Sequence, residues 1–461
     1  MLLITRRRFL SAGAAVLPLL RSPWAPGPGA RPQTRRPVPT PAQLEWQRDE
    51  LALFLHFGVN TFTDREWGDG REDPTIFSPT ALDARQWARV AKAGGFRALI
   101  LTAKHHDGFC LWPSRTTQHS VASSPWRNGQ GDVVREFTDA CRAEGLKVGL
   151  YLSPWDRNHP TYGDSPRYND LYCDQLTELL TGYGPVQEIW FDGANGEGPN
   201  GKRQVYDWPR YWGVVKQLQP DAVIFSDAGP DVRWIGNERG VAGETNWSTV
   251  KPDAVPYPGA IGEGVFRALQ EGDPEGTVWR PGETDVSIRP GWFYHPAEDG
   301  QVKSVAGLVG LYFTSVGRNS KLLLNVPPTR DGLLHEVDSA RLAQMRHRLA
   351  ALFAEDLAAG QRVAWRVTGP RTAEGALDLG DPVTIGMADL REDITRGQVV
   401  ARYRLEGFTG GGWMTLSTGT TIGYRKLDRF EPTPVHQVRL RIEDAVEQPR
   451  PVRVGLYASV S

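Results

Sequence analysis

Short apolar segments alternate with amphipathic helical segments from about residue 40 to residue 354. Apolar runs suited to buried strands occur at 51–60, 96–102, 147–152, 188–191, 222–227, 283–288 and 321–326. Helical patterns separate most of them in units of about 45 residues, at 83–94, 132–144, 168–180, 208–218, 302–316 and 338–354. Parallel strands need crossovers of this length. The pattern predicts an α/β fold, a (β/α)8-like TIM barrel over residues 41–354 in which some helices are irregular.

The pattern changes after the barrel segment. From Gln361 onward, apolar and polar residues alternate with a period of two, at 362–367, 398–405, 438–442 and 452–457, and Gly and Pro residues separate these runs. This is the pattern of strands that bury one face. We therefore expect residues 355–461 to form a C-terminal antiparallel β-sandwich.

The N-terminal 30 residues have a composition of their own. They contain Arg6, Arg7, Arg8 and Arg21 and no acidic residue, and an apolar run occupies 10–20, which is too short to span a bilayer. Paired arginines before such a run resemble a twin-arginine export signal, and a general secretion signal is the alternative. Residues 1–30 are therefore predicted to be an export signal and 31–40 a linker. The expected location is periplasmic or extracellular.

Charge and cysteine content exclude several classes of function. The formal net charge is −1, and it becomes −5 when the four leader arginines are removed, so neither nucleic acid nor a membrane surface is an expected partner. The three cysteines allow at most one disulfide and lack the spacing of a metal site. No cofactor is expected, and the oligomeric state stays open.

Polar and aromatic residues gather where the predicted strands end. In a parallel barrel these ends form one face, which carries the functional groups. Together such residues suit a polyhydroxylated ligand, because they supply hydrogen bonds and flat apolar walls. The set is His56, Glu66, Trp67, His105, His106, Tyr151, Trp190, Asp192, Glu238 and Trp292.

Asp192 follows a four-residue apolar strand directly. It is either a turn residue or a catalytic carboxylate. Glycoside hydrolysis needs two carboxyl groups, one of them protonated near neutral pH. Asp192 is the candidate nucleophile. Glu238 is the candidate partner, and Glu66, Glu244 and Glu263 compete for that role.

Simpler interpretations exist for the other residues. His56 on its own is typical of a hydrogen-bonded core histidine, and Trp292 of core packing. His105 and His106 suggest a metal site, but adjacent residues in a strand point to opposite faces, and no carboxylate or cysteine partner stands at a fixed spacing. We therefore expect no metal.

Several motifs occur together in one order. They are Leu55-His56-Phe57-Gly58, Glu66-Trp67, Lys104-His105-His106-Asp107-Gly108-Phe109 followed by Leu111-Trp112-Pro113-Ser114, and Trp190-Phe191-Asp192-Gly193. This set resembles the α-L-fucosidases of glycoside hydrolase family 29 and covers the whole barrel segment. The resemblance implies a (β/α)8-like barrel with a C-terminal β-sandwich, and hydrolysis of α-L-fucosides with retention.

The resemblance also implies individual roles. Asp192 corresponds to the nucleophile. The fucose pocket would comprise His56, Glu66, Trp67, His105, His106 and Tyr151, with Trp190 and Trp292 as walls. The segment 233–238 resembles the branch specific for α-1,3/1,4 linkages, which implies that Glu238 is the acid/base. The implied partner is a fucosylated oligosaccharide.

Two other functions stay open. One is a non-catalytic protein that binds fucosylated glycans. The other is a metal-dependent barrel hydrolase that uses His105 and His106. Neither the natural glycan nor the role of the C-terminal domain follows from these motifs, although residues 419–424 of that domain are similar to relatives.

Overall fold

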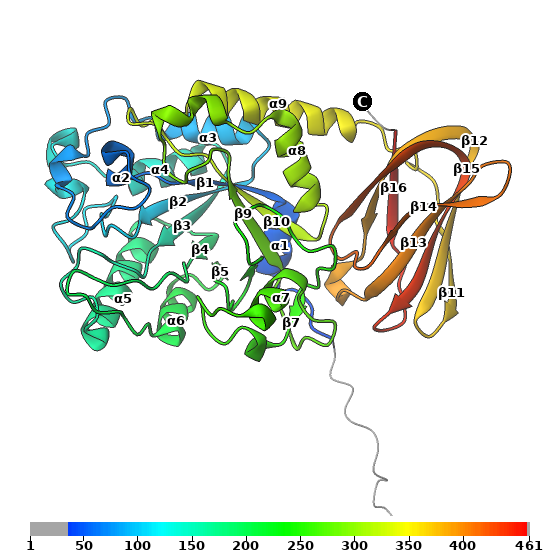
Figure 1. Ribbon diagram of the computed structural model, residues 1–461, viewed down its shortest axis with the longest axis horizontal. Helices are drawn as coiled ribbons and strands as arrows, with labels where there is room; N and C mark the ends of the chain where they lie inside the picture. The colour runs from blue at the N-terminus through cyan, green and yellow to red at the C-terminus, as the bar shows by residue number, and fades with distance from the viewer. Residues whose placement is uncertain (1–35, 459–461) are drawn as a thin grey trace, which may run out of the picture. The chain divides into compact units, whose positions relative to one another are not determined.

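Eight parallel strands form the centre of the first domain in the computed structural model, which describes residues 36–458 (Figure 1). Their order around the sheet is β5-β4-β3-β2-β1-β10-β9-β6. A parallel bridge between Phe225 and Val232 links the two ends of this sheet, so the barrel is nearly closed. The strands are β1 (Leu51–Leu55), β2 (Ala98–Lys104), β3 (Lys147–Leu152), β4 (Glu188–Trp190), β5 (Val223–Phe225), β6 (Arg233–Trp234), β9 (Gly282–Ser287) and β10 (Ser320–Asn325). The predicted TIM-like barrel is confirmed.

Two barrel strands differ from the prediction: β1 is shorter than expected, and β6 was not predicted. β1 ends at Leu55 and not near residue 60, because Gly58 turns the chain into the short helix α2 (Val59–Thr63). The eighth strand, β6, is only two residues long, and no apolar run marks it. A two-stranded antiparallel sheet of β7 (Thr249–Val250) and β8 (Val278–Trp279) lies between β6 and β9, and the helix α7 (Glu263–Glu271) connects its strands.

Helices connect most of the strands. α3 (Ala84–Ala93), α4 (Val133–Ala143), α5 (Ser165–Gly182) and α6 (Trp208–Leu218) follow the first four strands, and α7 (Glu263–Glu271), α8 (Val305–Thr314) and α9 (Glu336–Leu352) follow β6, β9 and β10. Between β5 and β6 the described chain has a turn and no helix. Short 3-10 helices lie at Pro74–Ile76, Val121–Ser123, Trp126–Gly129, Pro252–Ala254, Pro296–Gln301 and Ile394–Arg396.

The helix α1 (Pro41–Asp49) closes the amino-terminal end of the barrel. It begins with a capping box, in which Thr40 Oγ1 accepts a 3.2 Å hydrogen bond from the backbone N–H of Gln43. The amide of Gln43 donates to the carbonyl groups of Asp231 and Trp279, at 2.6 and 2.9 Å. Trp46 is fully buried in the cluster that fills the barrel interior. α1 therefore covers the amino-terminal end of the barrel interior.

The C-terminal strands form one antiparallel sheet around a separate core, which confirms the predicted β domain. The two longest strands, β12 and β15, pair along their length with register shifts that let the sheet bend. The strands are β11 (Ala364–Gly369), β12 (Thr372–Arg391), β13 (Val400–Phe408), β14 (Trp413–Gly419), β15 (Lys426–Ala445) and β16 (Arg453–Tyr457).

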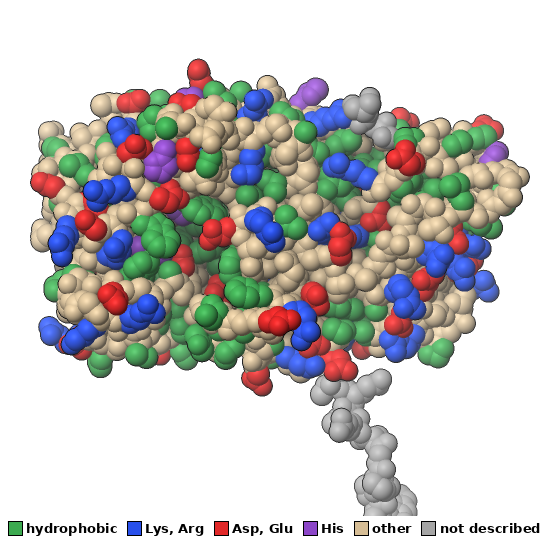
Figure 2. Space-filling model, in the orientation of Figure 1, with side chains coloured by type: hydrophobic (Ala, Val, Ile, Leu, Met, Phe, Trp, Pro, Cys, Tyr) green, Lys and Arg blue, Asp and Glu red, His purple; other side chains and the backbone are tan. Residues whose placement is uncertain are grey.

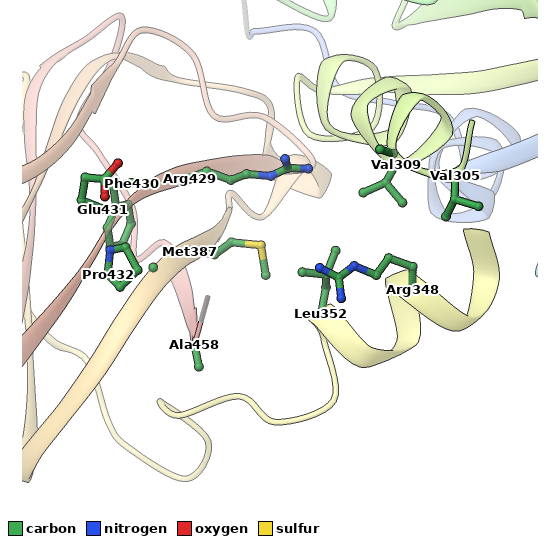
Figure 3. Close-up of a pocket in the computed structure, with 12 residues that line it drawn as sticks. Val305, Val309, Arg348, Leu352, Met387, Arg429, Phe430, Glu431, Pro432 and Ala458 are labelled. Carbon is green, nitrogen blue, oxygen red and sulfur yellow. The ribbon is translucent and has the colours of Figure 1, made fainter. Parts of the chain in front are cut away.

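Barrel and β domain belong to one compact unit that begins at Pro37. At one part of their junction a cavity of about 510 Å³ lies between α8, α9 and the strands β12 and β15 (Figure 3). Met387 and Arg429 extend from the β domain toward Val309 of α8, and the Arg429 guanidinium lies 3.3 Å from the ring centroid of Phe313. Elsewhere the junction is tightly hydrogen-bonded.

Three further sequence features concern the N-terminal segment, membrane crossing and the cysteines. The predicted export signal at 1–30 and the linker up to residue 35 lie outside the described residues. Of the helices that are described, none combines the length and apolarity that a membrane crossing requires. Cys110, Cys141 and Cys173 are buried free thiols.

Candidate active site

All ten side chains selected from the sequence line one pocket of about 330 Å³ at the carboxyl ends of the barrel strands. Phe54, Ala194 and Asp285 complete its lining. In the space-filling view, hydrophobic side chains gather in the barrel half, where acidic and basic side chains are interspersed (Figure 2). The expected convergence of strand-end residues is therefore present in the fold.

His105 and His106 reach the same pocket although they are neighbours in sequence. β2 ends at Lys104, and both residues lie in the turn that follows. Their ring centroids are 4.1 Å apart. Irregular backbone after the strand thus replaces the opposite orientation that regular strand geometry would impose.

Asp192 is held by two hydrogen-bond donors. Its Oδ2 accepts from the phenol of Tyr151 at 3.0 Å, and its Oδ1 accepts from the backbone N–H of Ala194 at 2.7 Å. Tyr151 and Trp190 are register partners in adjacent parallel strands, which brings the Tyr151 ring beside the end of β4. The Asp192 side chain keeps 26% of its surface exposed. It is an oriented carboxylate that a ligand in the pocket can touch.

Glu238 lies four residues beyond β6, at the exposed edge of the pocket. Partial burial of its carboxyl group, together with the charges of Asp192 and Glu66, raises its pKa, although the Trp292 side chain donates a hydrogen bond to it. A raised pKa favours the protonated acid, the form that can donate a proton to a leaving group.

Glu66 is anchored to the loop that carries Trp292. Its carboxylate accepts hydrogen bonds from the backbone N–H groups of Trp292 and Phe293, the second at 3.2 Å, and lies 3.0 Å from His295 Nε2. Burial alone would lower the pKa of His295, but hydrogen bonds to Glu66 and Asp64 raise it. Glu66 is thus fixed in position by the loop that carries Trp292.

The other two competing glutamates lie away from the pocket. Glu244 pairs with Arg318 and, at 3.1 Å, with Lys426 of the β domain. Glu263 is the first residue of α7 and is exposed. Neither lines the pocket.

The pocket histidines are neutral because they are buried. Burial lowers the pKa of His56 to about 3 and lowers those of His105 and His106 as well. His56 Nδ1 lies 2.8 Å from Asn325 Oδ1, and His106 Nδ1 lies 2.7 Å from Ser153 Oγ. These contacts orient the rings, so that the free nitrogens can exchange hydrogen bonds with ligand hydroxyl groups.

Asp285 is a pocket residue that the sequence analysis missed. It lies in β9, and its Oδ1 accepts a 2.7 Å hydrogen bond from the indole of Trp234. Burial and the charge of Glu238 raise its pKa well above the ordinary value for aspartate. Asp285 lies inside the predicted strand 283–288 and not after its end, so the signal that selected Asp192 does not select it.

Aromatic rings form the floor and one rim. Trp190 stacks on Phe225 with ring centroids 4.1 Å apart, and Phe54 packs beside it. Trp67, 57% exposed, meets Trp155 edge-on at the mouth. Because the floor belongs to the packed barrel interior, a ligand enters from the strand-end side only.

Beneath the floor two glutamates and a lysine share the barrel core. Lys321 Nζ lies 3.1 Å from Glu188 Oε2, and the indole of Trp190 donates to Glu283 Oε1 at 3.1 Å. Burial and the charge of Glu188 raise the pKa of Glu283 well above its ordinary value. The raised pKa favours the neutral acid form of Glu283 beside the ion pair of Lys321 and Glu188.

Metal-ligating side chains do not cluster in the described part of the chain. No group of three or more His, Cys, Asp or Glu side chains there has the geometry to hold an ion.

One oriented carboxylate and one glutamic acid with a raised pKa face a pocket lined by neutral histidines and aromatic rings. Glycoside hydrolases on TIM-like barrels use this combination of groups.

Comparison with known proteins identifies the family. The model of the α-L-fucosidase family matches residues 33–351. The chain belongs to the α-L-fucosidase family of glycoside hydrolases.

Relatives and solved structures agree with this assignment. Alpha-L-fucosidase 1 of Arabidopsis thaliana is 44% identical, with 91% of this chain and 87% of the plant protein covered. A glycoside hydrolase 29 family member from an unknown rumen bacterium is 42% identical, with a TM-score of 0.86 over 93% of this chain and 78% of that structure. A Ruminococcus gnavus GH29 fucosidase, solved in complex with fucose, is 31% identical, with a TM-score of 0.83 over 94% and 97%.

Proposed function

We propose that this α-L-fucosidase removes terminal α-1,3- or α-1,4-linked fucose from oligosaccharides or glycoconjugates, with retention of configuration. The observation that supports this most is the pair of carboxyl groups in one pocket, Asp192 held by two donors and Glu238 with a raised pKa. A retaining mechanism uses one carboxylate as nucleophile and one carboxylic acid as proton donor.

In this mechanism Asp192 attacks the anomeric carbon of fucose. The bond to the leaving oxygen breaks as Glu238 transfers its proton to that oxygen. In the second step Glu238, now a carboxylate, takes a proton from water, and the water oxygen displaces Asp192 from the anomeric carbon. The hydrogen bonds to Asp192 from Tyr151 and Ala194 fix the attacking oxygens and stabilise the carboxylate when it leaves.

The remaining pocket residues bind the sugar. His56, His105 and His106 are neutral and supply donors and acceptors to the hydroxyl groups, and Glu66 accepts from them. Trp67, Trp190 and Trp292 contact the apolar edges of the ring. A pocket of about 330 Å³ with a closed floor suits one terminal residue, which supports an exo mode of action.

The linkage preference rests on the segment 233–238, which resembles the α-1,3/1,4-specific branch. Hydrolysis of matched trisaccharides with α-1,2, α-1,3 or α-1,4 fucose, beside an aryl fucoside, tests it. We expect release from the α-1,3 and α-1,4 substrates. Preference for the α-1,2 or the aryl substrate would overturn this part of the proposal.

Two variants test the catalytic roles. Asp192→Ala should lose several orders of magnitude in kcat on every substrate, because no other side chain can form the glycosyl-enzyme bond. Glu238→Ala should lower kcat/KM far more on oligosaccharides than on an aryl fucoside, because the aryl leaving group needs no proton. Near-normal turnover by Asp192→Ala, or product of inverted configuration detected by NMR, would contradict the mechanism.

Export forms a separate part of the proposal, and it rests on residues 1–30 alone. We propose that Arg6 and Arg7 direct the chain to the twin-arginine route. Replacing both by lysine should retain the protein in the cytoplasm of a bacterial host. Unchanged export of that variant, measured by cell fractionation, would contradict this route.

A further inference from the structure

A chain of hydrogen bonds joins the β domain to the strand that precedes Glu238. Thr421, in the loop between β14 and β15, accepts a 2.8 Å hydrogen bond through Oγ1 from the backbone N–H of Asn246. Asn246 Oδ1 accepts a 2.7 Å hydrogen bond from Nη2 of Arg233, the first residue of β6. Two side chains thus connect a β-domain loop to the edge of the barrel.

Arg233 is an unusual residue to bury. Its exposed fraction is 1%, and among the described residues no carboxylate pairs with it. Its guanidinium donates to three neutral oxygens, the carbonyl groups of Leu269, at 2.9 Å, and Arg280, and the amide of Asn246. Burial and the charge of Arg280 lower its pKa to about 9. A buried cation without an anion depends on every acceptor it has.

Asn246 is held by residues of both domains, and Asn319 of the barrel donates a 2.9 Å hydrogen bond to its carbonyl. Besides the bond to Thr421, its carbonyl accepts a 3.1 Å hydrogen bond from the amide of Gln398, just before β13. Its own amide donates to the carbonyl of Arg318 at 2.7 Å. Asn246 is fully buried. Loss of the Thr421 contact therefore removes one of the hydrogen bonds that fix Asn246, whose Oδ1 is an acceptor for Arg233.

From Arg233 the connection continues into the pocket. The next residue, Trp234, donates its indole N–H to Asp285, which lines the pocket beside Glu238. Glu238 itself follows Trp234 by four residues and has no regular element of its own to hold it. The placement of β6 consequently sets where the Glu238 loop begins.

We propose that Thr421 and Asn246 are positioning residues through which the β domain holds β6, and with it Glu238, in place for proton transfer. Neither residue lines the pocket. The proposal rests on the proposed function, because it assigns the acid/base role to Glu238. It also gives the β domain a part in catalysis that requires no sugar binding by that domain.

The leaving group separates this role from a general structural one. Hydrolysis of an oligosaccharide expels a sugar alkoxide and needs a well-placed acid, whereas 4-nitrophenolate leaves without a proton. A misplaced Glu238 therefore slows formation of the glycosyl-enzyme much more with the oligosaccharide than with the aryl fucoside, whereas the later attack by water, which also uses Glu238, is common to both substrates. A general loss of folded protein would slow hydrolysis of both substrates equally.

The experiment compares kcat/KM on an α-1,3-fucosylated trisaccharide with kcat/KM on 4-nitrophenyl fucoside, because kcat/KM reports the steps up to formation of the glycosyl-enzyme. Thr421→Val, which removes the acceptor at nearly constant volume, should lower the first about tenfold and the second less than twofold. Thr421→Ser, which keeps the hydroxyl group, should restore the wild-type ratio. Equal losses on both substrates, or no loss on either, would overturn the proposal.

Two controls come from the same domain. Thr418→Val changes an exposed threonine of β14 and should leave both rates unchanged. Tyr403→Phe removes a buried 2.7 Å hydrogen bond to Asp428 and should lower Tm without changing the ratio of the two rates. A ratio changed by Tyr403→Phe as much as by Thr421→Val would contradict a specific connection through Thr421.

Glu238→Ala distinguishes failure of this inference from failure of the proposed function. If Glu238→Ala loses activity selectively on the trisaccharide and Thr421→Val does not, only the positioning role fails. If Glu238→Ala remains active on the trisaccharide, the acid/base assignment fails, and the positioning role with it.

Discussion

The phenol oxygen of Tyr151 lies 3.0 Å from Oδ2 of Asp192, at the junction of two parallel strands. Burial raises the pKa of Tyr151 well above its ordinary value, so the phenol remains a donor over the whole working pH range. Asp192 therefore meets a fixed O–H group before any substrate binds. The consequences of this contact can be measured directly.

Tyr151→Phe should lower kcat about tenfold to a hundredfold, because a hydrogen bond to a charged group is lost while the ring stays in place. Tyr172→Phe is the matched control, since the phenol of Tyr172 donates to the carbonyl of Leu152 at 2.6 Å and does not line the pocket. Steady-state kinetics on an aryl fucoside provides the comparison. Equal losses of kcat in the two variants would show that the Tyr151 hydroxyl group has only a structural role.

Trp292→Phe should move the alkaline limb of the pH profile to higher pH. The hydrogen bond from Trp292 favours the ionised form of Glu238 and lowers its pKa, so removing this bond raises the pKa further. Activity on oligosaccharides requires protonated Glu238 and falls as pH rises through that pKa. Trp67→Phe, which alters another wall of the pocket, should reduce kcat/KM without moving the limb.

Asp107→Asn should stabilise the protein at alkaline pH. Burial, with the charges of Glu72 and Asp156, raises the pKa of Asp107 to about 7 despite a 2.7 Å hydrogen bond from the backbone N–H of Phe109. The folded state thus binds more protons than the unfolded state between about pH 4 and pH 7, and stability falls as pH rises through this range. Asparagine removes this loss, worth up to about 4 kcal/mol.

The test of Asp107→Asn is the difference in Tm from the wild type as a function of pH. We expect a higher Tm for the variant at pH 8 and convergence near pH 4. The variant amide can also donate to Asn60, whose Oδ1 is buried without a partner among the described residues. A Tm difference that does not change with pH would show that Asp107 is ionised in the fold.

Glu283→Gln should be tolerated and Glu283→Leu should not. Glutamine keeps an acceptor for the indole of Trp190 and a donor for Glu188, the two partners of the neutral acid. Leucine leaves both unpaired, at a cost of roughly 3 kcal/mol in the free energy of unfolding. Urea denaturation measures the difference, and the infrared C=O band of a neutral carboxylic acid should be missing from Glu283→Gln. Equal destabilisation by both variants would indicate an ionised Glu283.

The barrel and most of the pocket could be predicted from the sequence because they depend on local patterns. Buried parallel strands are apolar along their length, and the polar residues that end them are confined to one face by the topology. His56, Tyr151 and Asp192 were found in this way. His105 and His106 were found through their motif, since only the irregular turn after β2 brings both into the pocket.

What could not be predicted depends on tertiary contacts. β6 has only two residues, one of them the buried Arg233, and its pairing is decided by β9 and by acceptors far apart in the sequence. Asp285 was missed because it lies inside β9 and not at the carboxyl end, where the candidate residues were sought. The contact of Thr421 with Asn246 spans 175 residues and leaves no local pattern.

The helix α1 has a consequence for how the chain is assembled. Its contacts with Glu188, Asp231 and Trp279 join residues that are 142, 188 and 236 positions apart. During synthesis, roughly ten seconds or more pass between the appearance of α1 and that of the last of these partners. Until then the indole of Trp46 and the underside of the growing sheet are both uncovered. α1, the first helix of the described residues, thus completes its contacts only after most of the barrel strands have been synthesised.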